Sequence, residues 1–129
     1  RTIKVTGTDI FSGTKDTIGK QKKFKIMNDR NEAVFFSIAA LISKGNVLIK
    51  GLDKSNLFSF VNVLSKLNAS YEFSDRELRI WDNGELLNST NLSTGPYPEF
   101  MTSWQPLIST LLTQAEGQSK RAQHDGSRY

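Results

Sequence analysis

The sequence predicts an α/β fold in which strands and helices follow the order β-α-β-α-β-β between residues 24 and 82. Short segments in which apolar and polar residues alternate predict the strands, and two longer apolar segments between them predict the helices. The length of 129 residues suits one modest domain. Its 37% hydrophobic and 23% charged residues are typical of a globular protein with a real core.

The chain is expected to divide into four parts. Residues 1–23 supply the end strand of a preceding unit, Thr2–Thr6, followed by a loop. Residues 24–82 form one complete βαβαββ unit, and residues 83–119 form the start of a second. The tail, residues 120–129, has no apolar periodicity and is therefore predicted to be disordered.

The complete unit begins with a predicted strand, and its first helix is predicted from residue 33 to residue 42. That segment is nearly all apolar and too long for a typical strand, so we expect a helix buried on most sides. Gly45 is expected at its C′ position. The predicted strands of the unit are Phe24–Ile26, Asn46–Lys50, Tyr71–Phe73 and Leu78–Trp81.

The clearest helical periodicity lies between residues 57 and 67, where five apolar residues share one face and must therefore lie on a sheet. Asp53 or Ser55 can cap the start of this helix, and Asn68 can adopt the left-handed conformation at its end. The five residues of the stripe are Leu57, Phe60, Val61, Leu64 and Leu67.

The second unit is expected to contain a short strand near Leu92 and a helix from about Ser103 to Ala115, ended by Gly117. With no Cys and one His, the sequence excludes disulfides and offers no set of Cys or His ligands for a metal. No apolar segment reaches the length that spans a membrane, and we expect a cytoplasmic protein without a membrane partner.

The net charge of +4 and a pI near 9.4 would suit a phosphate-rich partner. Much of the excess charge lies in a strip of lysines between predicted elements, where lysines are usually only solvated. The strip consists of Lys20, Lys22, Lys23 and Lys25. An RNA-binding module that uses this strip and Phe24 is an alternative hypothesis, but the strip lacks interleaved aromatic residues and we do not expect nucleic acid as a partner.

Residues 28–32 (Asn-Asp-Arg-Asn-Glu) are the first candidate site. Asp29 and Glu32 have the spacing of a capping box, and carboxylates suit the positive end of a helix dipole. The same charged cluster also suits a ligand cleft at the end of a strand. The residues alone leave both interpretations open.

Residues 95–105 (Gly-Pro-Tyr-Pro-Glu-Phe-Met-Thr-Ser-Trp-Gln) are the second candidate site. Two prolines stiffen a loop that leads into a helix, whose free amide groups could bind a phosphate or a sugar hydroxyl. The cap of that helix is either Thr102, which has capping-box spacing to Gln105, or Ser103, which would place Pro106 more favourably. An ordinary capped helix explains the segment equally well.

Taken together, these segments resemble the enolpyruvyl transferases that act on UDP-N-acetylglucosamine. Residues 28–32 correspond to the family's Pro-Asp-Arg-Ile-Glu, and residues 95–100 to its Ala-Pro-His/Tyr-Pro-x-Phe. The Ala-rich helix before Gly45, the helix before Ala69 and the segment ending in Ala-Glu-Gly117 also match the family. The likeness covers residues 2–119.

The resemblance implies an inside-out α/β barrel built from βαβαββ units, of which this chain would hold one complete unit and part of the next. It implies transfer of enolpyruvate from phosphoenolpyruvate to the 3-hydroxyl of UDP-N-acetylglucosamine in peptidoglycan synthesis, without a cofactor. The substrate-binding residues that it implies here are Asp29, Arg30, Tyr97 and Ser103. The family's Cys-bearing loop and its phosphate-binding Lys and Arg residues lie in stretches that this chain does not match.

Within the likeness, the family's Phe-Pro-Thr-Asp-Met-Gln is replaced by residues 100–105, with Ser103 at the position of the Asp that lies against the reacting hydroxyl. Serine cannot carry a negative charge at neutral pH, and loss of a positioned acid or base typically costs about 10²–10⁴ in rate. Trp104 is larger than the family's residue and could partly fill the sugar site.

Three hypotheses follow. The first is a transferase fragment that depends on the remainder of the enzyme and is inactive alone. The second is the non-catalytic binding module for RNA or another phosphate-rich partner. The third is a structural remnant whose unpaired sheet edges promote self-association.

Overall fold

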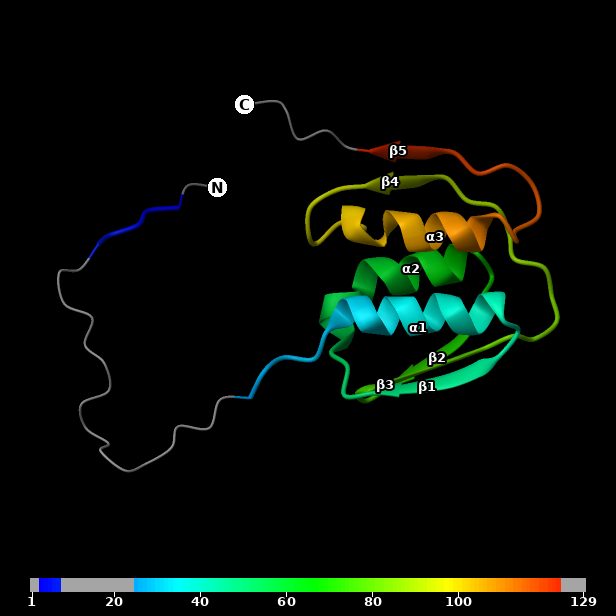
Figure 1. Ribbon diagram of the computed structural model, residues 1–129, viewed down its shortest axis with the longest axis horizontal. Helices are drawn as coiled ribbons and strands as arrows, with labels where there is room; N and C mark the ends of the chain where they lie inside the picture. The colour runs from blue at the N-terminus through cyan, green and yellow to red at the C-terminus, as the bar shows by residue number, and fades with distance from the viewer. Residues whose placement is uncertain (1–2, 8–24, 124–129) are drawn as a thin grey trace.

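The computed structural model describes residues 3–7 and 25–123 and shows an α/β fold with three helices between two small sheets (Figure 1). In chain order, the described elements are the helix α1 (Arg30–Ile42), the strand β1 (Asn46–Lys50), the 3-10 turn η1 (Lys54–Leu57), the helix α2 (Phe58–Lys66), the strands β2 (Ser70–Ser74), β3 (Glu77–Trp81) and β4 (Leu92–Thr94), the 3-10 turn η2 (Thr102–Trp104), the helix α3 (Gln105–Leu112) and the strand β5 (Arg121–Gln123).

The larger sheet has the order β1-β3-β2, with both neighbours antiparallel to β3. Leu78 and Ile80 of β3 are buried because their side of the sheet faces the helices. The register places Val47 of β1 and Tyr71 of β2 on either side of Ile80, so one apolar face continues across all three strands. This alternation of buried and exposed residues confirms the predicted strands of residues 46–50, 71–73 and 78–81.

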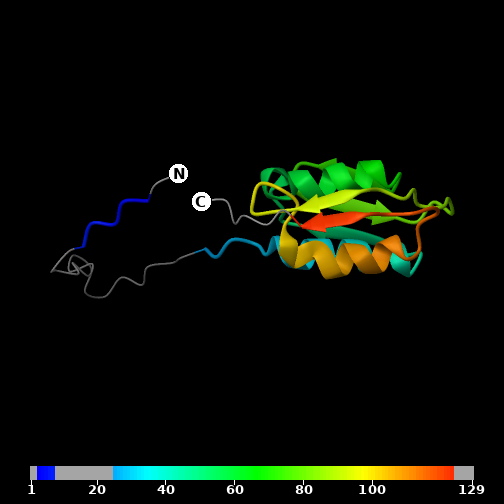
Figure 2. The same ribbon diagram turned by 90° about the horizontal axis from the view of Figure 1, so that it is seen from above.

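The second sheet is the parallel pair β4–β5, and α3 is the crossover between its strands. Viewed from above, α2 lies on one side of this pair and α3 on the other (Figure 2). The strand near Leu92 is thereby confirmed. The prediction of disorder from residue 120 onward is wrong for β5, because Arg121–Gln123 is held by backbone pairing that requires no apolar pattern. Residues 124–129 lie outside the described residues.

The two predicted strands at the start of the chain are not found. Residues 3–7 form neither a helix nor a strand, and Ile3 and Val5 are each 86% exposed. Lys25 and Ile26 also belong to no strand, while Thr2 and Phe24 lie outside the described residues. Alternating apolar residues make a strand only when a neighbouring backbone pairs with them, and no described residue pairs with these segments.

The core is formed by residues of α1, α2, α3 and the larger sheet. All five residues of the predicted stripe between Leu57 and Leu67 are buried, which confirms the face of α2 that was expected to lie inward. α1 was predicted to be buried on most sides, and this is wrong. Phe35 and Phe36 are 51% and 50% exposed because α1 contacts α3, β1 and β3 with one face only. None of the helices in the described segments is both long and apolar enough to cross a membrane.

Both α1 and α2 end in the same motif. The residue after the C-cap has a positive φ, 55° at Lys44 and 56° at Asn68, and the next amide donates a hydrogen bond to the carbonyl oxygen five residues earlier. Asn68 was predicted in this role at the end of α2. At the end of α1, Gly45 was expected at C′, but Lys44 occupies that position and Gly45 follows it. Its amide donates to the Ala40 carbonyl oxygen at 2.8 Å.

Trp104 joins several elements of the core. Its side chain is 1% exposed and contacts Phe60 of α2 and Phe100 edge to face, with ring centroids 6.1 and 5.4 Å apart. Its indole Nε1–H donates a hydrogen bond of 2.7 Å to Oδ1 of Asn31 in the first turn of α1. The suggestion that Trp104 partly fills a sugar site is therefore wrong, because the indole lies in the core.

We expect Lys44→Gly to raise the free energy of unfolding by about 0.5–1 kcal/mol, because glycine adopts a positive φ without the steric cost that lysine carries. Lys66→Gly is the matched control. Lys66 lies within α2, where glycine should lower the stability by about 0.5–1 kcal/mol. Urea denaturation measures both changes, and equal effects of the two substitutions would contradict the prediction.

We expect Trp104→Phe to lower the free energy of unfolding by about 1–2 kcal/mol, because it removes a partly buried hydrogen bond and part of the core. Combining it with Asn31→Ala in a double-mutant cycle should give a coupling energy of at least about 0.5 kcal/mol. Trp81→Phe, on a tryptophan of β3 that does not contact Asn31, should show no coupling with Asn31→Ala. Additive effects of Trp104→Phe and Asn31→Ala would refute the link.

Candidate functional site

The start of α1 is a capped helix end that carries two of the predicted site residues. Asp29 is the N-cap, and its Oδ1 accepts a hydrogen bond of 2.7 Å from the Asn31 amide. The capping interpretation of Asp29 is thus correct, and Glu32 lies in the first turn as expected. Only one carboxylate oxygen of Asp29 is used by the cap. Because Asp29 is exposed, its other oxygen remains available to a ligand.

The loop between β4 and η2 carries Tyr97. The Gly95 amide donates to the Phe100 carbonyl oxygen at 2.9 Å, and the Glu99 amide donates to the Pro96 carbonyl oxygen at 3.0 Å. These bonds close a compact turn, which contains the cis peptide bond between Tyr97 and Pro98. The turn holds the exposed ring of Tyr97 outward.

Neither predicted cap of the following helix is found. The segment Thr102–Trp104 forms a 3-10 turn, and α3 begins after it at Gln105 without a side-chain cap. Pro106 is therefore the second residue of α3, where no intrahelical amide is needed. Ser103 lies exposed in the 3-10 turn, and within the described part of the chain its side chain makes no hydrogen bond.

The structure brings the two candidate segments together. The Arg30 guanidinium lies over the Tyr97 ring, with Cζ 4.8 Å from the ring centroid, a distance typical of a cation–π contact. A second contact joins the same segments, because Trp104, the neighbour of Ser103, donates its indole hydrogen bond to Asn31, the neighbour of Arg30. Arg30 and Tyr97 are thus in direct contact, whereas Asp29 and Ser103 flank this junction without a hydrogen bond between their side chains.

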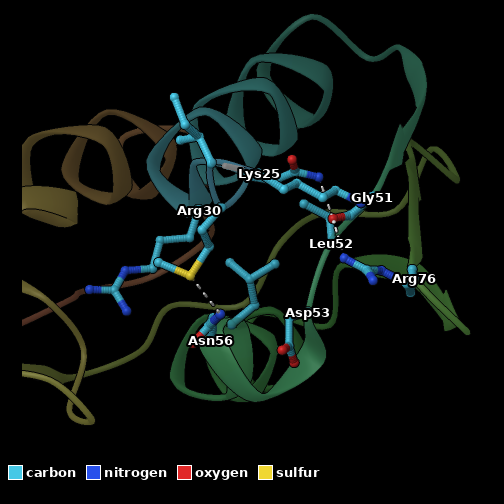
Figure 3. Close-up of a pocket in the computed structure, with 11 residues that line it drawn as sticks. Lys25, Arg30, Gly51, Leu52, Asp53, Asn56 and Arg76 are labelled. Atoms are coloured by element: carbon cyan, nitrogen blue, oxygen red, sulfur yellow. Dashed lines mark hydrogen bonds between the residues drawn. The ribbon is translucent and has the colours of Figure 1, made fainter. Parts of the chain in front are cut away.

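A cavity of about 220 Å³ lies beside the start of α1 (Figure 3). It includes Arg30 at its margin but none of Asp29, Tyr97 and Ser103. Lys25, Asn28 and Arg76 also line it. Asn28 belongs to the first candidate site and Lys25 to the lysine strip, whereas Arg76 was not identified as a site residue from the sequence. Arg76 is far from the other two in the chain, so only folding reveals that the three are neighbours.

One titratable group in the described chain has a clearly shifted pKa. Hydrogen bonds from the Ser55 hydroxyl and from the Ser55 amide hold the pKa of Asp53 below its ordinary value, and the charge of Arg76 acts in the same direction. Asp53 is therefore ionised at neutral pH at one edge of the cavity.

No group of three His, Cys, Asp or Glu residues within the described ranges is placed to hold a metal ion.

Comparison with known proteins identifies relatives. The chain is 32% identical over 119 residues to the UDP-N-acetylglucosamine 1-carboxyvinyltransferase of Protochlamydia amoebophila, a match that covers 92% of this chain and 24% of the relative. The enzymes of the same name from Wolbachia of Brugia malayi and from Halothermothrix orenii are 32% and 33% identical. The matches cover 89% and 91% of this chain and 28% of each relative. The chain therefore spans about a quarter of the length of these relatives.

The fold is also found in a solved structure, that of the enolpyruvyl transferase NikO from Streptomyces tendae. The TM-score is 0.60 at 17% sequence identity, and the match covers 76% of this chain and 24% of NikO. A family model described as EPSP synthase (3-phosphoshikimate 1-carboxyvinyltransferase) matches residues 2–125. This match, together with the relatives and the shared α/β fold, shows that the chain belongs to the EPSP synthase family of enolpyruvyl transferases.

Proposed function

We propose that this chain forms part of a transferase that moves enolpyruvate from phosphoenolpyruvate to the 3-hydroxyl of UDP-N-acetylglucosamine, an early step of peptidoglycan synthesis. In this reaction, the hydroxyl oxygen forms a bond to C2 of phosphoenolpyruvate, the bond from C2 to the phosphate oxygen breaks, and the hydroxyl proton and phosphate leave. The names of the relatives support this substrate pair. The observation that carries the proposal is the contact of Arg30 with Tyr97, which joins the two candidate segments.

Arg30 and Tyr97 are suited to binding a sugar nucleotide. The cation fixes the aromatic ring from one side, and the exposed tyrosine offers both an apolar face and a hydroxyl group to a ligand. The free carboxylate oxygen of Asp29 can accept a hydrogen bond from a sugar hydroxyl. In the proposal, these three residues bind and orient the sugar nucleotide and carry out no chemistry themselves.

Ser103 limits the chemistry of this part of the protein. An exposed serine hydroxyl can donate a hydrogen bond to the reacting hydroxyl or accept one from it, but at neutral pH it does not take the proton of the reacting hydroxyl as a base. We therefore propose that this chain contributes binding rather than proton transfer and shows no turnover alone. The parts of a full-length enzyme that this chain does not match would complete the active site. A cytoplasmic location stays a prediction.

The proposal is tested by NMR titration of the ¹⁵N-labelled chain with UDP-N-acetylglucosamine. We expect saturable shifts of the amide signals of residues 29–31, 97 and 99–103, and Arg30→Gln should weaken binding by about two- to fivefold. The matched control is Arg79→Gln. Arg79 also lies over an aromatic ring, that of Trp81 at 5.3 Å, but belongs to β3, so its removal should leave binding unchanged.

Two results would overturn the proposal. Shifts that do not saturate, or that are as large around Arg79 as around Arg30, would remove the assigned binding site. Release of phosphate by the isolated chain, supplied with both substrates, would show that it carries the complete catalytic machinery, which the proposal denies.

A further inference from the structure

The cavity beside α1 is formed by three segments that are distant in the sequence. The segment before α1 forms one wall, the loop after β1 and the turn η1 form the others, and the turn between β2 and β3 closes the edge (Figure 3). Asn28 donates a hydrogen bond from Nδ2 to the Gly51 carbonyl oxygen, which fixes the segment before α1 against the loop. The cavity is thus tied together by specific contacts.

Positive charge exceeds negative charge in the lining of this cavity. Lys25, Arg30 and Arg76 contribute three positive charges and Asp53 one negative charge, so the net charge of the lining is +2 (three minus one). The ion pair between Lys50 and Glu77 is the one salt bridge among the described residues, so none of the three cations forms a salt bridge within that part of the chain, and Asp53 is close enough to Arg76 only for their charges to attract. Like charges gathered around a hollow attract an anion.

The donors of these cations differ in their availability. Figure 3 shows the Arg30 guanidinium directed away from Gly51 and Asp53, in keeping with its contact with Tyr97. Arg76 uses Nη2 to donate to the Gly51 carbonyl oxygen at 3.3 Å, which leaves its other N–H groups for a ligand. Lys25 and Arg76 are both exposed. Lys25 and Arg76 therefore supply the binding charge, and Arg30 contributes at longer range.

The size and walls of the cavity restrict the ligand. The volume of about 220 Å³ lies below the roughly 300–1,000 Å³ of pockets that hold drug-sized ligands, and it suits a phosphate group with a few carbon atoms. Leu52 and Leu57 form apolar parts of the wall, and Asn56 adds an amide. Apolar walls lower the local dielectric constant and so strengthen the attraction between the cations and an anion.

We propose that this cavity, named here the Lys25–Arg76 pocket, binds a small molecule that bears a phosphate group. Arg76 offers a planar set of donors to the phosphate oxygens, Lys25 supplies a compact charge, and the apolar wall accommodates a short carbon chain. The inference does not depend on the proposed transfer reaction, because it rests on residues other than Asp29, Tyr97 and Ser103.

The probe for the test is inorganic phosphate, added to the ¹⁵N-labelled chain at constant ionic strength maintained with chloride. We expect saturable shifts of the amide signals of Asn28, Leu52 and Arg76. Lys25→Gln and Arg76→Gln should each weaken phosphate binding by about two- to fivefold, as for other exposed charge pairs. Glycerol phosphate is titrated in the same way. If the natural ligand is a phosphate ester, glycerol phosphate should bind more tightly than inorganic phosphate, because its carbon chain contacts the apolar wall. If the natural ligand is free phosphate, inorganic phosphate should bind equally well or better.

Two further variants give the test its controls. Asp53→Asn removes the opposing charge but retains a residue that can cap η1, so it should tighten phosphate binding by about two- to fivefold without unfolding the turn. Lys66→Gln removes one exposed charge from α2, outside the pocket, and should have no effect. Non-saturating shifts spread over the surface lysines, or an equal loss of binding in Lys66→Gln and Lys25→Gln, would overturn the proposal, even if UDP-N-acetylglucosamine binds as proposed.

Discussion

The burial of the Trp104 indole is the constraint on which the candidate site depends. The ring fills the space between Phe60 of α2 and Phe100 of the loop, and its N–H must find an acceptor once water is excluded. Asn31 supplies that acceptor from α1. One side chain thereby fixes the start of α1, the loop that carries Tyr97 and the turn that carries Ser103 in one arrangement.

The two residues of this hydrogen bond are also departures from the motifs that the chain resembles. Asn31 stands where the family writes Ile, and Trp104 stands where it writes Met. An apolar pair needs no hydrogen bond, whereas a buried indole without an acceptor would be costly. The two departures are therefore physically coupled. Their pairing was the signal in the sequence that could have placed the two candidate segments side by side.

Local patterns were sufficient to predict much of the fold. The stripe from Leu57 to Leu67, the cap at Asp29 and the left-handed residue Asn68 each depend on neighbours within one helix, so the sequence alone contains the necessary information. The strand predicted at residues 2–6 failed because pairing needs a distant backbone. The strand β5 was missed for the same reason, since Arg-Ala-Gln has no apolar pattern and is recognised only by its bonds to β4.

The site could be predicted only in part, because its residues come from separate elements. The motif resemblance selected Arg30 and Tyr97, and the structure shows them in contact. Lys25 was noted only as part of the lysine strip and Arg76 not at all, and the two line one cavity only because the turn between β2 and β3 reaches the segment before α1. The buried Thr94 is another feature that the sequence could not predict. Its hydroxyl has no hydrogen-bond partner within the described residues, and nothing in its local sequence indicates this.

The parallel pairing of β4 with β5 has a consequence for the order of folding. The two-residue turn between β2 and β3 lets that hairpin form between close neighbours, whereas β4 meets β5 only after a crossover in which bonded residues such as Lys120 and Asn91 are 29 positions apart. Contacts of long sequence separation form slowly, because the entropy of closing the loop is lost before the contacts are gained. Tyr97 and Ser103 lie within this loop, so we expect the surface that carries them to be among the last parts of the fold to form.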